Sequence, residues 1–174
     1  MAEAFAPHAL PTDKAARYRS LAEEIAAVVE GESDIVARMS SVAAMLAAAF
    51  ETFFWTGFYR VDPANARELV VGPYQGTLGC LRIAFGRGVC GTAAERRETL
   101  IVADVEAFDG HIACDSRSRS EIVVPVFGPG RELIAVLDVD SASLAAFDHT
   151  DAAGLEAILD QVFASEPRAA TPTR

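Results

Sequence analysis

Residues 121–140 read Glu-Ile-Val-Val-Pro-Val-Phe-Gly-Pro-Gly-Arg-Glu-Leu-Ile-Ala-Val-Leu-Asp-Val-Asp, and this stretch decides the fold. Two apolar segments, 121–127 and 132–140, flank a Gly-Pro-Gly sequence that is typical of a turn. Short apolar runs bounded by turn residues predict β-strands. Because the second run is apolar almost to its end, we expect it to be a central strand of a sheet.

The chain upstream of this stretch supplies further strands. An aromatic segment at 53–61, followed by a turn and a segment at 68–71, predicts a hairpin. The alternating run 80–85 predicts another strand, and a short helix is expected at 92–97. A polar stretch from 103 to 120 predicts a long loop, and a loop of that length in a compact domain is usually functional.

Helical periodicity marks both ends of the chain. Thr12 is a candidate N-cap for a first helix, and a second helix is expected at about 33–50. Asp148 is a candidate N-cap for a last helix that reaches about Phe163. This order of elements predicts an α+β fold in which helices flank a central antiparallel sheet.

Composition limits the function. The chain has 174 residues, which favours a single domain. We place the domain at 15–163, after a lead-in at 1–14 and before a flexible tail at 164–174. The formal net charge of −10 would repel phosphate backbones, so we expect no nucleic-acid partner. The sequence has neither a membrane-spanning run of roughly 18 apolar residues nor a secretion signal, so we expect a cytoplasmic protein that binds no membrane.

The chain contains three cysteines, Cys80, Cys90 and Cys114. An odd count in a chain of this length argues against a framework of structural disulfides and favours reduced thiols. Their spacing matches no common zinc pattern, so we expect no metal. Cys90 and Cys114 lie among glycine and polar residues rather than in apolar runs, which indicates redox chemistry instead of packing.

Cys114 is the best candidate for a nucleophile. It follows His111 in the long polar loop and precedes a serine/arginine stretch whose cations would lower its pKa. Cys90 lies at an expected helix start, where the helix dipole would stabilise a thiolate. Cys80 begins an expected strand, and a core position explains it equally well.

Asp138 and Asp140 share one face of the expected central strand, because side chains alternate with a period of two. Two neighbouring carboxylates raise the pKa of one of them, which makes a proton donor or a cation site, and Glu121 could join them. The alternative is an exposed strand end where both acids meet solvent. Trp55 and Tyr59 also share a face of their strand, where they would wall an apolar pocket or belong to the core.

Five longer motifs occur in order along the chain. They are Gly72-Pro73-Tyr74-Gln75-Gly76, Gly86-Arg87-Gly88-Val89-Cys90-Gly91-Thr92, Asp109-Gly110-His111-Ile112-Ala113-Cys114-Asp115, Ser120-Glu121-Ile122-Val123-Val124-Pro125 and Val136-Leu137-Asp138-Val139-Asp140-Ser141. Together they resemble the free methionine-(R)-sulfoxide reductases, a family of small enzymes with a GAF-type fold. The resemblance covers roughly residues 15–163 and implies a GAF-like single domain.

The resemblance implies reduction of free L-methionine (R)-sulfoxide to methionine, without a bound cofactor. It makes Cys114 the residue that attacks the sulfoxide sulfur and is left as a sulfenic acid. A second cysteine, Cys90 or Cys80, would then form a disulfide that thioredoxin reduces. Because glycines flank Cys90 and make its segment adaptable, we expect a Cys90–Cys114 bond, with Cys80–Cys114 as the alternative.

The resemblance also implies a substrate pocket. Glu121, Asp138 and Asp140 would hold the ammonium group of the free amino acid and protonate the sulfoxide oxygen. Trp55 and Tyr59 would surround the methyl group. Peptide-bound methionine lacks the ammonium group, so a carboxylate cluster would select the free amino acid.

Two other functions fit parts of the sequence. A GAF-type domain could sense a small molecule without catalysis, and such a sensor needs no nucleophile. A cysteine amidase could use Cys114 with His111, but residues so close in sequence rarely provide both a base and an oxyanion hole. The sequence does not decide between a monomer and a homodimer.

Overall fold

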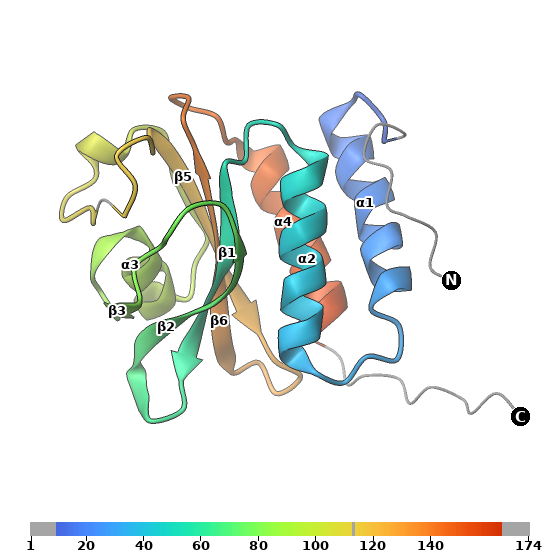
Figure 1. Ribbon diagram of the computed structural model, residues 1–174, viewed down its shortest axis with the longest axis horizontal. Helices are drawn as coiled ribbons and strands as arrows, with labels where there is room; N and C mark the ends of the chain where they lie inside the picture. Colours follow the sequence, from blue (N-terminus) through green and yellow to red (C-terminus); the bar gives the residue numbers. More distant parts are fainter. Residues whose placement is uncertain (1–9, 113, 165–174) are drawn as a thin grey trace, which may run out of the picture.

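The computed structural model describes residues 10–112 and 114–164, and Figure 1 shows how their helices and strands are arranged. The elements are α1 (Lys14–Val28), α2 (Ile35–Ala49), β1 (Trp55–Asp62), β2 (Asn65–Gln75), β3 (Arg82–Ala84), α3 (Gly88–Arg96), β4 (Leu100–Val102), the 3₁₀ helix η2 (Val105–Ala107), β5 (Ser120–Phe127), β6 (Leu133–Ser141) and α4 (His149–Phe163). The expected α+β class is confirmed. Most of the expected lead-in and tail lies outside the described residues, although Leu10 of the lead-in is buried in the core. None of the described helices is long and apolar enough to cross a membrane.

The described strands form one six-stranded sheet in the order β3-β2-β1-β6-β5-β4. Every neighbouring pair is antiparallel, and the pairing of β1 with β6 joins the β1–β2 hairpin to the β5–β6 hairpin. The strand predicted at 132–140 is therefore central, as expected. Its residues Ala135, Leu137 and Val139 face one core cluster, whereas Val136 faces the other.

The two faces of the sheet are covered differently (Figure 1). Helices α2 and α4 pack on one face, and α1 lies outside them, mainly against α4. The main apolar core fills this side and includes Phe58 of β1. Helix α3 lies on the opposite face, where a second cluster contains Trp55, Tyr59 and Cys90. The second face therefore carries the aromatic and thiol side chains that the sequence singled out.

Aspartate caps define where the long helices begin. Asp13 accepts a hydrogen bond from the amide of Ala16 at 2.8 Å, so the cap of α1 is one residue later than the predicted Thr12. Asp148 caps α4 as predicted, and Asp151 completes a capping box with it.

The chain around the third strand differs most from the prediction. The expected strand at 80–85 spans only Arg82–Ala84, so Cys80 lies in the loop that follows β2. The expected helix at 92–97 begins earlier, at Gly88, and Cys90 therefore lies in its first turn. Both differences change the surroundings of a cysteine.

Candidate active site

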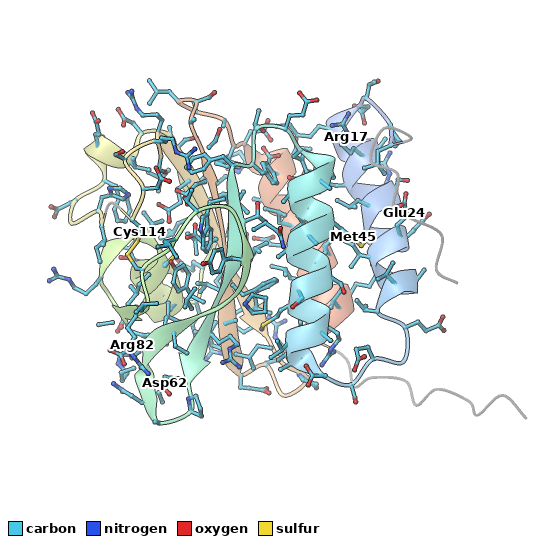
Figure 2. The ribbon with its side chains drawn as sticks, in the orientation of Figure 1. Arg17, Glu24, Met45, Asp62, Arg82 and Cys114 are labelled. Carbon is cyan, nitrogen blue, oxygen red and sulfur yellow. A yellow bond between two sulfur atoms is a disulfide. The ribbon has the colours of Figure 1, made fainter. Side chains whose placement is uncertain are left out.

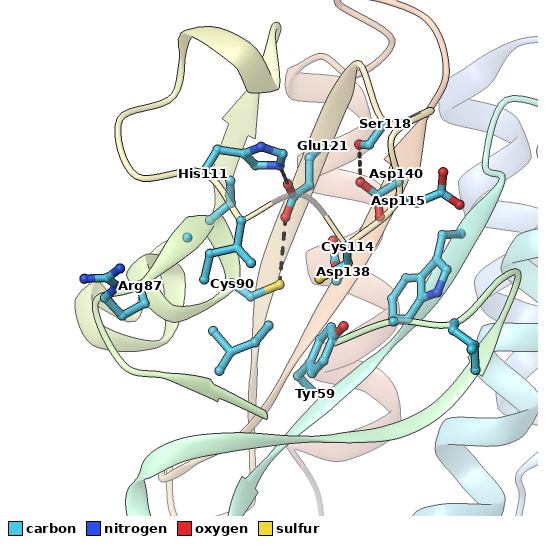
Figure 3. Close-up of a pocket in the computed structure, with 17 residues that line it drawn as sticks. Tyr59, Arg87, Cys90, His111, Cys114, Asp115, Ser118, Glu121, Asp138 and Asp140 are labelled. Atoms are coloured by element: carbon cyan, nitrogen blue, oxygen red, sulfur yellow. Dashed lines mark hydrogen bonds and ion pairs between the residues drawn. The ribbon is translucent and has the colours of Figure 1, made fainter. Parts of the chain in front are cut away.

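A pocket lies on the second face of the sheet, between β1, β6, β5, helix α3 and two loops (Figure 3). Its lining includes these predicted site residues: Trp55, Tyr59, Cys90, Cys114, Glu121, Asp138 and Asp140. The remaining predicted residue, Cys80, is bonded to Cys114. The free volume of the pocket is about 30 Å³, which holds about one water molecule. The pocket is therefore narrow in this structure.

Strand register brings the three acids together. Glu121 of β5 pairs with Asp140 of β6, and Asp138 pairs with Gly57 of β1 on the other side. Because side chains alternate along each strand, all three acids face the pocket. Glu121 and Asp138 are each only 6% exposed and Asp140 is partly buried, so the alternative in which Asp138 and Asp140 both meet solvent at an exposed strand end is wrong.

Burial raises the pKa of all three carboxyl groups. Loss of water is the main cause for Glu121 and Asp138, and the charge of neighbouring acids adds to it. Burial raises the pKa of Asp140 to about 6, while a hydrogen bond from the Ser118 hydroxyl opposes the rise. The Oδ1 atom of Asp138 has no hydrogen-bond partner among the described residues. Carboxyl groups that stay protonated near neutral pH can donate a proton to a ligand.

Cys90 is buried beneath these acids in the first turn of α3. Its Sγ lies 3.8 Å from Oε1 of Glu121 in a weak hydrogen bond. Burial raises the pKa of the Cys90 thiol well above its usual range, and the charges of Asp138 and Glu121 add to the rise. The predicted thiolate at this helix start is therefore wrong, because burial among acids outweighs the helix dipole.

Cys80 and Cys114 form a disulfide with their Cα atoms 5.6 Å apart (Figure 2). The expected Cys90–Cys114 bond is wrong for this structure, in which Cys90 is a free thiol. Because β3 is short, Cys80 lies in a loop that reaches Cys114, whereas Cys90 is fixed in a helix. Gly91, after Cys90, allows close packing of the helix against Ala84, because a Cβ at Gly91 would lie 2.3 Å from the Ala84 carbonyl oxygen. This glycine therefore does not make the Cys90 segment adaptable, contrary to the expectation from the sequence.

Polar contacts also join the two loops that carry Cys80 and Cys114. The Thr77 hydroxyl donates a hydrogen bond to Oδ2 of Asp115 at 2.6 Å, and Arg117 donates to the same oxygen at 2.8 Å. The Arg117 guanidinium holds the pKa of Asp115 well below its usual range and lies 4.8 Å from the centre of the Phe54 ring. Arg117 is thus paired with Asp115. It is therefore not free to stabilise a Cys114 thiolate, which is the role expected of the nearby cations from the sequence.

Stacked aromatic rings form one wall of the pocket. The rings of Trp55 and Tyr59 are 5.6 Å apart, and Tyr74 stacks on Trp55 at 5.3 Å. The backbone at Gly79 packs tightly against these rings. A Cβ at this position would lie only 2.7 Å from the Tyr59 hydroxyl. Gly79 lines the pocket but was not predicted from the sequence, whereas Tyr74, which lies in one of the sequence motifs, supports Trp55 without lining the pocket itself.

Comparison with known proteins identifies the family. The GAF domain model matches residues 18–165. GAF domain-containing protein A of Dictyostelium discoideum is 49% identical over 84% of this chain and 90% of its own length. The free methionine-R-sulfoxide reductase of Escherichia coli strain K12 is 39% identical over 83% of this chain and 86% of its own. The X-ray structure of free methionine-R-sulfoxide reductase from Neisseria meningitidis, in complex with its substrate, has a TM-score of 0.82 and 51% identity, and the match covers 89% of this chain and 93% of that one.

The chain belongs to the free methionine-R-sulfoxide reductases of the GAF domain family. The GAF-like fold inferred from the sequence motifs is thereby confirmed.

Three side chains of the pocket have the right chemistry and spacing to hold a metal ion. Among the described residues, the ligand atoms of Cys90, Glu121 and Asp138 all lie within 4.8 Å of one another. The same side chains line the pocket. They therefore belong to the pocket that the other predicted site residues line, and we propose no metal there.

Two residues of the long loop, His111 and Ser118, contact the pocket acids, and neither contact was predicted from the sequence. His111 Nε2 lies 3.8 Å from Oε2 of Glu121, and burial lowers the pKa of the imidazole. Ser118 donates its hydroxyl hydrogen to Asp140. No hydrogen bond joins His111 to Cys114 in the described part of this family member, so the geometry gives no support to the amidase alternative. Position in a polar loop was the only sequence signal for either contact.

Proposed function

We propose that the protein reduces free L-methionine (R)-sulfoxide to L-methionine. The observation that carries the proposal is the cluster of three carboxyl groups that face the pocket, two of them on buried residues, beside a redox-capable cysteine pair and an aromatic wall. The relatives from E. coli and N. meningitidis are named for this activity, and the N. meningitidis structure contains its substrate. These similarities support the same substrate for this chain.

The first step moves the sulfoxide oxygen to a cysteine. The Cys114 thiolate attacks the sulfur of the sulfoxide, and the sulfur–oxygen bond of the substrate breaks. The sulfur–sulfur bond formed by the attack then breaks as the protonated oxygen passes to the Cys114 sulfur, which leaves Cys114 as a sulfenic acid and releases methionine. The cysteine is oxidised by two electrons, and the sulfoxide is reduced by two.

The buried acids have two tasks in this step. The sulfoxide oxygen is a poor leaving group until it accepts a proton, and a carboxyl group with a raised pKa supplies that proton near neutral pH. An ionised neighbour pairs with the ammonium group of the free amino acid. Asp138 is suited to contact a ligand, because one of its oxygens has no hydrogen-bond partner in the described structure. Trp55 and Tyr59 contact the methyl group, which fits their apolar ring faces.

The cycle closes through Cys80. Its thiol attacks the sulfenic sulfur of Cys114, which forms the disulfide and releases water. Thioredoxin then reduces the disulfide to two thiols. The described Cys80–Cys114 bond supports Cys80, rather than Cys90, as the resolving residue. Such a cycle requires a reducing compartment, and we therefore propose the cytoplasm as its location.

A coupled assay tests the proposal. The purified protein, with thioredoxin, thioredoxin reductase and NADPH, is given free methionine (R)-sulfoxide, the (S) epimer and the N-acetylated (R)-sulfoxide. We expect NADPH oxidation with the free (R) form alone. Equal turnover of the two epimers would contradict the shaped pocket, and turnover of the N-acetylated compound would contradict recognition of the ammonium group. A folded protein that reduces none of them would favour the sensor function instead.

A further inference from the structure

The two leucines on either side of Cys80 are the most exposed large apolar side chains of the described structure. Leu78 is 82% exposed and Leu81 is 74% exposed, and Ile112, two residues before Cys114, is 38% exposed. Single exposed leucines are ordinary in a folded protein. Leu78 and Ile112 also line the pocket, and Leu81 adjoins Cys80, so all three flank the partly exposed disulfide, where exposed apolar side chains indicate an interaction surface. We call Leu78, Leu81 and Ile112 the apolar rim.

The backbone holds Leu81 in place although its side chain meets solvent. The Leu81 carbonyl accepts a hydrogen bond from the amide of Val71 at 3.0 Å, which fixes it beside β2. The next residue, Arg82, is paired with Asp62 and Glu68. The apolar side chain is therefore displayed from an ordered segment, so little conformational entropy would be lost when a partner covers it.

Two charged side chains lie in the segments that carry the apolar rim, since Arg82 follows Leu81 and Arg117 pairs with Asp115, the residue after Cys114. Arg82 and Arg117 are both about half exposed, and Figure 2 shows Arg82 on the same side of the molecule as Cys114. An apolar centre with a polar edge is the usual anatomy of a protein interface. The patch is small, which suits the transient contacts of redox partners at the low end of interface areas.

We propose that the apolar rim is the docking surface for a protein dithiol of the thioredoxin kind, and this inference rests on the function proposed above. The partner's thiolate attacks one sulfur of the Cys80–Cys114 bond, and the other cysteine leaves as a thiolate. The partner's second thiol then displaces the first, which leaves a disulfide in the partner. Two electrons and two protons pass from the partner's thiols to Cys80 and Cys114. Apolar contact around the bond holds the partner's sulfur within reach of it.

The substitution Leu81→Asp tests the docking surface. Leu81 does not line the pocket, and its backbone hydrogen bond to Val71 is kept in the variant. We expect the KM for thioredoxin to rise about tenfold, as for loss of an interface anchor, while turnover supported by dithiothreitol is unchanged. Leu81→Met should behave like the wild type with both reductants. Val28→Asp is the matched control, because Val28 is an exposed apolar residue of α1, on the other side of the sheet.

A second measurement needs no methionine sulfoxide and separates this inference from the proposed activity. Each protein is oxidised with diamide, and its reduction by thioredoxin or dithiothreitol is followed by thiol alkylation and gel shift. Slower reduction of Leu81→Asp by thioredoxin alone supports docking at the apolar rim, even if the substrate assignment fails. Reduction at the wild-type rate by thioredoxin would overturn the inference. Equal slowing with both reductants would also overturn it, because Leu81 would then act on the disulfide and not on the partner.

Discussion

Glu121 and Asp140 lie directly opposite each other on β5 and β6, and Asp138 continues the same face two residues along β6. The Gly128 amide donates to the carbonyl of Glu132 at 2.9 Å in the turn between the strands, and a register shift between Val126 and Phe127 separates this turn from the paired acids. A shift of one residue in β6 would turn Asp138 and Asp140 toward the main core. The placement of the acids therefore depends on this bulge and on the pairing of β6 with β1 as well as on the turn.

Removal of either β6 acid should damage catalysis. Asp138→Asn or Asp140→Asn keeps the shape of the side chain but removes its proton and its charge. We expect kcat/KM for methionine (R)-sulfoxide to fall by about 10²- to 10⁴-fold in each variant, the usual effect of losing a general acid. Asp160→Asn, on the helical side, is the control and should leave the kinetics unchanged. Wild-type kinetics in both pocket variants would remove the acids from the mechanism.

The raised pKa of Asp140 predicts how stability changes with pH. Its pKa is about 6 in the folded protein against an ordinary value of 3.8, so the folded state keeps a proton that the unfolded state has lost. The free energy of unfolding should therefore fall as pH rises from about 4 through 6. Urea titrations of the oxidised wild type and of Asp140→Asn should show a smaller pH dependence in the variant. An equal dependence in both proteins would contradict the assignment.

Local periodicity explains the part of the site that was predictable. A period of two places Asp138 with Asp140 and Trp55 with Tyr59 on the same face, and the structure confirms both pairs. The partner of Cys80 was not predictable, because it depends on where two loops far apart in sequence meet after the strands have paired. The high thiol pKa of Cys90 has the same origin, since distant strands supply the acids that surround it.

Gly79 allows the loop of Cys80 to lie on the aromatic wall. The methyl group of Gly79→Ala would lie 2.7 Å from the Tyr59 hydroxyl and 3.0 Å from Trp55, so the loop would have to lift. We expect slower formation of the Cys80–Cys114 bond after diamide addition, measured by thiol alkylation. Adding Tyr59→Phe removes the nearest atom and should restore part of the rate. Bond formation at the wild-type rate in Gly79→Ala would show that the close approach is dispensable.

Cys114 should be required for the first chemical step. Cys114→Ser replaces the attacking sulfur with a weakly nucleophilic hydroxyl, so the variant should release no methionine even in a single turnover. Rapid-quench chromatography of methionine from stoichiometric enzyme and substrate measures this directly. Circular dichroism provides the control for folding. Release of one methionine per enzyme by the variant would assign the attack to Cys80 or Cys90.

The two remaining cysteines should behave differently. Cys80→Ser should release one methionine per enzyme and then stop with thioredoxin, because the sulfenic acid on Cys114 lacks the thiol that forms the described disulfide. Cys90→Ser should continue to turn over, because its thiol is buried against Glu121 and its raised pKa keeps it protonated. Burst amplitude, steady-state rate and peptide mapping of the substrate-oxidised proteins distinguish the variants. The reverse result, a single turnover in Cys90→Ser and continued turnover in Cys80→Ser, would make Cys90 the resolving residue and require α3 to move toward Cys114.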